Sequence, residues 1–189
     1  MTGKLLITTS REPSKRVRSF VKDLSIVLPH SVRVSRGKAT YSELATKATS
    51  LGAYGVLIVL ERRGNPSSIL YAEPRGTELE VMFLLKLGGV TLMRELPGSQ
   101  RPLGLGELIL VPSSVPKGFS EIVSSYLLQA LRPKIVESPG GRAVELKILG
   151  GEDGALITFI CVTSDRECGP RFRVVKVIDY VKRLTSSQP

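Results

Sequence analysis

Arginine and lysine are the chemically most useful residues of this sequence, because the usual catalytic and metal-binding residues are scarce. The 189 residues include 27 Lys and Arg, but one His and two Cys. His30 follows Pro29 at a predicted helix end. His30, Cys161 and Cys168 give three ligands, too few for a zinc site of four Cys or His ligands. The guanidinium and ammonium groups that remain are donors for phosphate oxygens. The sequence therefore predicts binding of a polyanion.

No motif supports catalysis or a bound cofactor. The phosphate-binding loop G-x-x-x-x-G-K-[ST] is absent, and Gly104 and Gly106 do not follow an apolar strand as a dinucleotide-binding loop would. Cys161 falls in an apolar strand, and Cys168 has no evident activating partner beyond Arg166, so two unpaired, unreactive thiols are expected. We expect no catalytic residue, no metal and no cofactor. A transferase or hydrolase would need a convergent polar pocket, of which the sequence gives no sign.

The same composition predicts a cytoplasmic protein. No apolar run reaches the roughly 18 residues that a membrane span needs, and the amino terminus lacks the features of a signal peptide. The two cysteines are not arranged as a disulfide framework, which suits a reducing compartment.

The positive charge is concentrated near the amino terminus. The formal net charge is +10, and nine basic residues between Lys4 and Lys38 are opposed there only by Glu12 and Asp23, which leaves nine minus two, or +7. Like charges crowded together repel one another unless a partner neutralises them. Nucleic acid is the favoured partner. A solvated basic face, an acidic protein and a membrane surface are the alternatives.

The elements that carry these charges alternate between strand and helix. Leu5–Ile7 is a predicted strand, and Ser14–Leu28 a helix with one apolar and one cationic face. Thr40 and Glu43 match a capping box that opens a second helix. Further strands are predicted over 31–35, 56–60, 69–72 and 79–87, with Gly88-Gly89 as a two-residue hairpin loop before a partner strand over 90–95.

The pattern then restarts. Pro and Gly are dense from residue 97 to residue 106, which marks a boundary. After it come a strand over 108–110, a helix between Pro116 and Pro133, and strands over 155–162 and 171–177. We predict an α/β fold of two similar halves related by internal duplication, residues 1–96 and 107–184, joined by a linker over 97–106.

Three groups of basic residues are candidates for phosphate contact. They lie in the turn and helix after the first strand, in the loop after the next strand, and in a hairpin: Arg11, Lys15, Arg16, Arg18 and Lys22; Arg33, Arg36 and Lys38; Arg62 and Arg63. Aromatic platforms for single strands are few, at most Tyr41, Tyr54, Tyr71 and Phe172. Lys and Arg contacts to the backbone of folded or duplex RNA are therefore expected.

Four segments resemble the Brix-domain family. They are LLITTSREPSKRVRSFVKDLSIVLP at the start, RVSRG with SEL, the ERRGNP turn, and ECGPRFRVVKV near the other end. The last is similar to the Gly-Pro-Arg-Phe signature of the family, whose arginine is Arg171 here. The resemblance implies a ribosome-biogenesis factor that binds rRNA, with two halves that each resemble the anticodon-binding domain of class II aminoacyl-tRNA synthetases. The short chain looks most like archaeal members and like the branch that processes small-subunit rRNA.

We therefore expect a monomeric, non-enzymatic protein that binds rRNA or pre-rRNA through the three basic groups and Arg171. It would assist pre-rRNA processing or subunit assembly, in company with other ribosome-assembly proteins and without a membrane. The alternative is a protein-interaction scaffold whose basic face meets an acidic partner.

Overall fold

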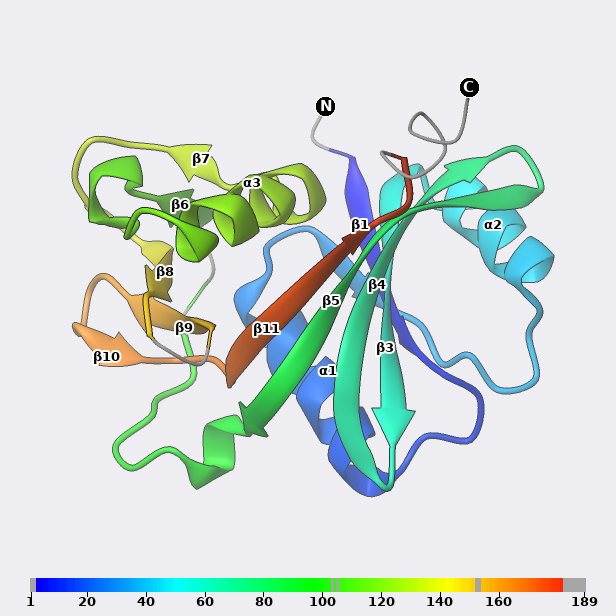
Figure 1. The fold of residues 1–189 in the computed structure, drawn as a ribbon, viewed down its shortest axis with the longest axis horizontal. Helices are drawn as coiled ribbons and strands as arrows, with labels where there is room; N and C mark the ends of the chain where they lie inside the picture. Colours follow the sequence, from blue (N-terminus) through cyan, green and yellow to red (C-terminus); the bar gives the residue numbers. More distant parts are fainter. Residues whose placement is uncertain (1–2, 103, 105, 152–153, 182–189) are drawn as a thin grey trace. The chain divides into compact units, whose positions relative to one another are not determined.

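The computed structural model describes residues 3–102, 104, 106–151 and 154–181 and shows a mixed α/β fold (Figure 1). In chain order the elements are β1 (Lys4–Thr9), α1 (Lys15–Val27), β2 (Ser31–Arg33), α2 (Tyr41–Ser50), β3 (Ala53–Arg62), β4 (Asn65–Arg75), β5 (Glu78–Thr91), the 3-10 turn η1 (Met93–Glu95), β6 (Glu107–Leu110), η2 (Pro112–Ser114), α3 (Phe119–Leu131), β7 (Lys134–Ile135), β8 (Ala143–Leu149), β9 (Ala155–Cys161), β10 (Arg166–Glu167) and β11 (Arg171–Asp179).

These elements form two compact units. The first unit holds the residues up to Val21, His30–Lys86 and those from Lys176 on, and the second holds Lys22–Pro29 and Leu87–Val175. The chain therefore passes between the units within α1, between Pro29 and His30, within β5 and within β11. The predicted halves, 1–96 and 107–184, are each continuous in sequence, whereas each unit combines segments from separate parts of the chain. Among the described residues of the expected linker, 97–106, none lies in a helix or strand.

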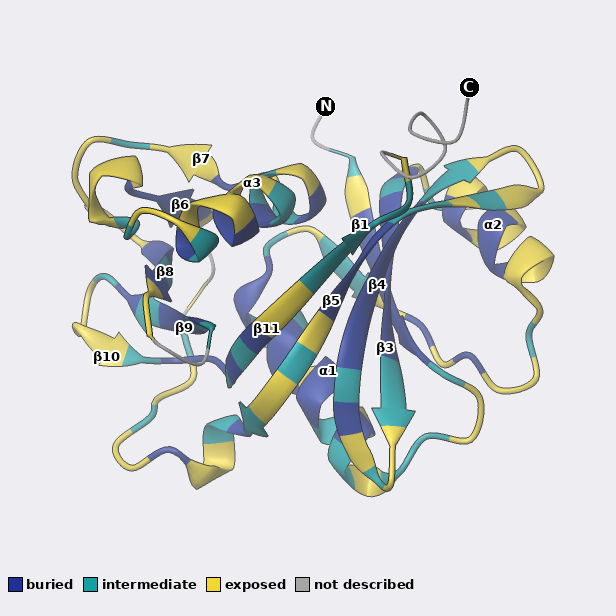
Figure 2. Cartoon of the chain, in the orientation of Figure 1, coloured by how far each residue is buried: buried dark blue, intermediate teal, exposed yellow. Residues whose placement is uncertain are grey.

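In the first unit, β1 is the central parallel strand. It pairs in parallel with β2 on one side and with β3 on the other. Strand β4 is the antiparallel neighbour of β3, and β5 is the antiparallel neighbour of β4. The apolar run of β3 is buried, as is most of β4 (Figure 2), because α2 packs on these two strands. Leu44 and Ala48 of α2 join Leu6, Val56 and Ile58 in one buried cluster.

The second unit pairs its strands in a similar order. β6 is parallel to β7 and β8, and β8, β9 and β11 are successive antiparallel neighbours. The short β10 pairs with the carboxyl end of β9, on the edge opposite β8. Helix α3 packs on β8 and β9. Strand β8, which was not predicted, lies between β6 and β9 and is mostly buried. A strand followed by a helix and two parallel partners thus occurs in both units, while the duplication itself stays a prediction.

The predicted Gly88-Gly89 hairpin is wrong. Strand β5 runs without a break through both glycines, and the segment after it is the turn η1 rather than a partner strand over 90–95. Gly88 serves a close approach instead, since a Cβ atom there would collide with the Cγ1 atom of Val175. A two-residue loop does join β3 and β4: Arg63 and Gly64 have φ angles of 51° and 79°, the positive values that a tight hairpin needs.

The expectation of two unpaired thiols is also wrong. Cys161 at the end of β9 and Cys168 just after β10 form a disulfide, with Cα atoms 5.7 Å apart. The antiparallel pairing of β10 with β9 brings the two residues together, which a separation of seven in the sequence does not reveal. Both side chains are buried. The bridge closes the turn that precedes the Gly-Pro-Arg-Phe segment.

Replacing both cysteines by alanine should lower the free energy of unfolding by about 2 kcal/mol, because the short loop is then open in the unfolded chain. Urea unfolding of the oxidised protein and of the Cys161→Ala/Cys168→Ala variant measures this difference. The wild type kept in a thiol reductant is the control and should match the variant. Equal unfolding midpoints for the variant and the oxidised protein would contradict a stabilising bridge.

Candidate nucleic-acid interface

The carboxyl ends of β1 and β2 lead into two loops that carry basic residues, Arg11 after β1 and Arg36 and Lys38 after β2. Because the two strands are parallel neighbours, the segment after Thr9 and the segment after Arg33 leave the sheet at the same edge. Ligands of α/β proteins commonly bind at such an edge. A hollow of about 720 Å³ lies there, which we call the basic hollow. It is lined by Thr9, Arg11, Glu12, Pro13, Arg18, Val21, Arg33, Val34, Ser35, Arg36, Gly37 and Lys38.

Hydrogen bonds to β1 and β3 fix the walls of the hollow. The hydroxyl of Thr8 donates to the carbonyl oxygen of Val34 at 2.8 Å, and the amide of Val34 donates to Ile7 at 2.9 Å. These bonds extend the pairing with β1 beyond the end of β2. On the other side, the amide of Ser10 donates to the carbonyl oxygen of Val59 at 2.9 Å. Both basic loops therefore start from fixed positions.

Five of the predicted RNA-binding residues line this hollow: Arg11, Arg18, Arg33, Arg36 and Lys38. They come from two of the predicted groups, which are separate in sequence and meet here because of the parallel pairing. Arg11, Arg18, Arg33 and Lys38 are exposed, so their charged ends reach solvent.

Arg36 differs from the other four because its side chain is only 8% exposed. Its Nε atom donates to the carbonyl oxygen of Ala39 at 3.2 Å, and its guanidinium carbon lies 4.6 Å from the centre of the Tyr41 ring. Such a cation–π contact holds the guanidinium in place without neutralising it. Tyr41 is itself half exposed and is the one aromatic candidate that lies beside a basic loop.

Little negative charge opposes these cations. Glu12 is the one acidic residue in the lining. Asp23, the acid of α1, is 9% exposed and accepts a hydrogen bond from the amide of Met93 at 2.9 Å. Burial raises the pKa of Asp23 above its ordinary value, against the lowering effect of that bond. Its carboxyl group therefore takes little part in the surface charge.

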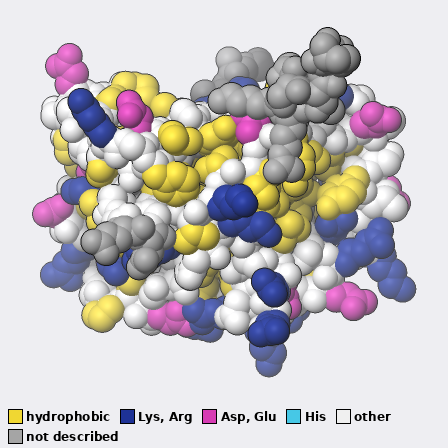
Figure 3. Space-filling view, in the orientation of Figure 1, with side chains coloured by type: hydrophobic (Ala, Val, Ile, Leu, Met, Phe, Trp, Pro, Cys, Tyr) yellow, Lys and Arg dark blue, Asp and Glu magenta, His cyan; other side chains and the backbone are white. Residues whose placement is uncertain are grey.

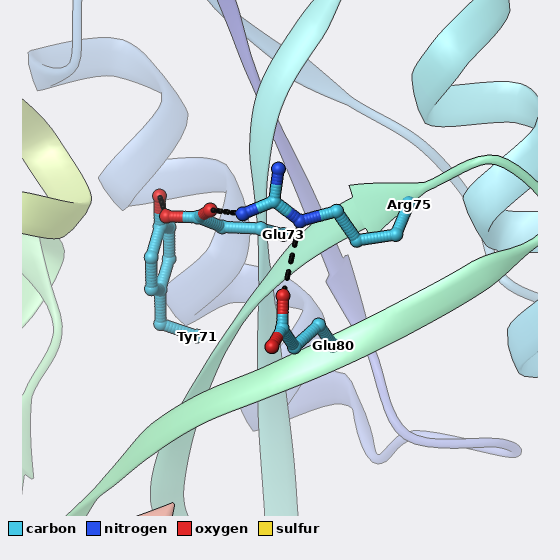
Figure 4. A network of polar contacts seen from close by, with 4 residues as sticks. All are labelled: Tyr71, Glu73, Arg75 and Glu80. Atoms are coloured by element: carbon cyan, nitrogen blue, oxygen red, sulfur yellow. Dashed lines mark hydrogen bonds and ion pairs between the residues drawn. The ribbon is translucent and has the colours of Figure 1, made fainter. Parts of the chain in front are cut away.

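Elsewhere the protein does pair its cations. Arg75 lies between Glu73, at 3.1 Å, and Glu80, at 3.0 Å (Figure 4), and Lys134 pairs with Glu107 at 3.0 Å. Among the described residues, no such ion pair involves the five cations of the hollow. On the face shown in Figure 3 the Lys and Arg side chains lie in small scattered groups. The concentration of unpaired charge is what distinguishes the hollow.

Ser14 ties the third basic group to the start of α1. Its amide donates to the Glu61 carboxylate at 2.7 Å, and its hydroxyl donates to the carbonyl oxygen of Gly64 at 2.8 Å. The same hydroxyl oxygen accepts from the amide of Val17, so Ser14 caps the helix. The exposed Arg62-Arg63 turn is thereby held beside the beginning of α1, although it does not line the hollow.

Neither Ser14 nor Glu61 was among the predicted site residues. A serine just before a basic amphipathic helix is a recognisable cap signal. Glu61 carries no such signal, because its contact joins residues 47 apart in the sequence.

The remaining candidates lie outside the hollow. Lys15 and Lys22 are exposed on α1, and Arg16 is half-buried there. Arg171, in the second unit, is bound by Glu167 through its Nε atom at 2.9 Å and its Nη2 atom at 2.6 Å. Burial alone would raise the pKa of Glu167, but hydrogen bonds from Arg171 and Thr158 outweigh it and lower this pKa below its ordinary value. Because the Glu167 carboxylate stays ionised and bound to Arg171, it neutralises much of the charge with which Arg171 could attract RNA.

No group of three or more His, Cys, Asp or Glu residues in the described part of the chain could hold a metal ion. None of the helices described is both long and apolar enough to cross a membrane. The hollow can bind anions, above all phosphates, through its convergent Arg and Lys donors.

The whole chain is similar to archaeal proteins of one kind. A probable Brix domain-containing ribosomal biogenesis protein of Aeropyrum pernix is 33% identical over 180 residues, which cover 94% of this chain and 98% of the relative. A protein of the same description from Pyrobaculum aerophilum is 30% identical over 184 residues, covering 95% and 96% of the two chains. No family model matches the sequence.

Solved structures agree with these relatives. The crystal structure of a probable ribosomal biogenesis protein from Aeropyrum pernix superposes with a TM-score of 0.81 at 32% identity, over 93% of this chain and 97% of the other. The archaeal Imp4-like protein Mil gives a TM-score of 0.68 at 22% identity, over 92% and 99% of the two chains. The second likeness shows a shared fold.

Ser14→Ala should lower the free energy of unfolding by about 1–2 kcal/mol, because it removes a helix cap and the bond to Gly64 together. Ser42→Ala, at an exposed position of α2, is the matched control and should change stability by less than about 0.5 kcal/mol. Urea unfolding measures both. An equally small effect at Ser14 would show that the bonds to the hairpin contribute nothing to stability.

Proposed function

The chain belongs to the Brix-domain family of ribosomal biogenesis proteins, and from this we propose that it binds rRNA or pre-rRNA through the basic hollow. Family membership confirms the resemblance seen in the sequence and supports a role in ribosome biogenesis. Beyond that role, we propose the binding partner, which is rRNA or pre-rRNA, and the binding surface, which is the basic hollow.

The observation that carries this proposal is the set of five cations around one hollow, none of which forms an ion pair with a carboxylate in the described part of the chain. Charges held close together raise the energy of the free protein, and phosphates relieve that repulsion. Arg62 and Arg63 extend the cationic surface from the start of α1. An rRNA segment could thus contact the hollow and the hairpin turn together.

The proposed role is non-enzymatic and electrostatic. The protein neutralises phosphates that would otherwise repel one another, and it thereby helps rRNA segments to come together during processing or assembly. It acts as a monomer in the cytoplasm, beside other assembly proteins. This description needs neither a cofactor nor a reacting group.

The finer description of the fold is also a proposal. Each unit has a strand with two parallel neighbours, followed by antiparallel strands, and this repeated order supports an internal duplication. We propose that each half resembles the anticodon-binding domain of class II aminoacyl-tRNA synthetases. Such an origin would fit a protein that binds structured RNA.

The RNA-binding proposal predicts strong salt dependence. About six phosphate contacts should make the logarithm of the binding constant fall with the logarithm of the salt concentration at a slope of about −4 to −5. The triple variant Arg11→Glu/Arg18→Glu/Arg33→Glu should reduce the magnitude of this slope by about 2 to 3, since each lost contact removes about 0.7–0.9. Fluorescence anisotropy with labelled rRNA fragments measures both slopes.

A second triple variant controls for net charge alone. Lys47, Lys86 and Lys117 are exposed and lie outside the hollow, so changing all three to Glu alters the net charge by the same amount. This variant should keep most of the wild-type slope. Equal losses in the two variants, or acidic proteins bound as tightly as rRNA, would favour the scaffold alternative.

A further inference from the structure

Within the proposed RNA-binding role, we propose that the basic hollow receives one unpaired nucleotide of the RNA, with its phosphate bound by Arg36. This inference rests on the proposed function. An unpaired nucleotide enters the hollow, whereas a regular RNA duplex does not.

The shape of the site is the first reason. The hollow is concave, and its volume of about 720 Å³ is in the range of pockets that enclose small-molecule ligands of nucleotide size. An RNA duplex carries its phosphates on a convex surface that is broader than such a pocket. A bulged, looped or terminal nucleotide can leave the helix and enter it.

The burial of Arg36 is the second reason. A charged side chain that is only 8% exposed is costly unless a partner neutralises it. Its guanidinium contacts the neutral carbonyl of Ala39 and the ring of Tyr41, and no carboxylate pairs with it among the described residues. The guanidinium is therefore held in position without a carboxylate beside it among the described residues. A phosphate is the ligand that such a group fits best.

The position of the other cations is the third reason. Arg33, at the end of β2, and Lys38, in the loop after it, flank Arg36 in the sequence and are exposed, while Arg11 and Arg18 line the hollow from the β1–α1 side. With one phosphate bound at Arg36, these four exposed cations could contact the neighbouring phosphates of the same RNA strand. Gly37, with a φ angle of +53°, allows the sharp turn that separates the buried Arg36 from the exposed Lys38.

Two RNA duplexes of the same length and sequence, one blunt and one with a single bulged uridine, test this inference. The wild type should bind the bulged duplex about tenfold more tightly than the blunt one, a difference of the size of one charge-assisted hydrogen bond. Arg36→Met should remove this preference and leave binding of the blunt duplex within about twofold of wild type. Lys47→Met, on the exposed surface of α2, is the control and should keep the preference.

Arg33→Met/Lys38→Met provides a second route in case Arg36→Met does not fold. Both residues are exposed, so this variant should fold as the wild type does and should lose most of the preference for the bulge. Equal wild-type affinity for the two duplexes, with RNA binding intact, would overturn the inference and spare the proposed function. Absence of binding to either duplex at low salt would overturn both. Preference for polyglutamate over the bulged duplex would identify a protein ligand and overturn both as well.

Discussion

The parallel pairing of β1 with β2 is the constraint on which the candidate site depends. Parallel strands need a crossover, and the crossover here is the amphipathic helix α1, whose apolar residues are buried and whose basic residues remain at the surface. The pairing also makes the two loops after these strands leave the sheet at one edge. Arg11 follows β1, Arg36 and Lys38 follow β2, and Arg18 of α1 and Arg33 at the end of β2 lie beside them, so the five cations line one hollow.

The electrostatics of the first unit follow from how its acids are used. Glu43 serves the cap of α2, where hydrogen bonds from the backbone and side chain of Thr40 lower its pKa below the ordinary value. Glu61 holds the start of α1, and Glu73 and Glu80 hold Arg75 (Figure 4). These four acids thus stabilise local structure, although the charge of Arg11 also lowers the pKa of Glu43, and Glu12 lines the hollow itself. The cations of the hollow are left for an external anion.

Much of this arrangement was predictable from local patterns. The helical spacing of Val17, Phe20 and Leu24 placed α1, all three being buried, and the capping box at Thr40 and Glu43 is present as expected. The basic groups of the first two loops were likewise visible in the sequence. Contacts between distant residues were not visible: the Ser14–Glu61 bond, the neighbour of Gly88 and the Cys161–Cys168 bridge each depend on how strands pair. A pair of glycines suits a tight turn and a close approach equally well, so the pattern alone could not separate them.

Crosslinking of the protein to rRNA, followed by identification of the crosslinked peptides, tests the central claim most directly. If the basic hollow holds the RNA, the crosslinks should fall in the β1–α1 loop around Arg11 and in the segment from Arg33 to Lys38. Crosslinks confined to the second unit, for example around Arg171, would contradict this account, as would a protein that acquires no RNA crosslinks.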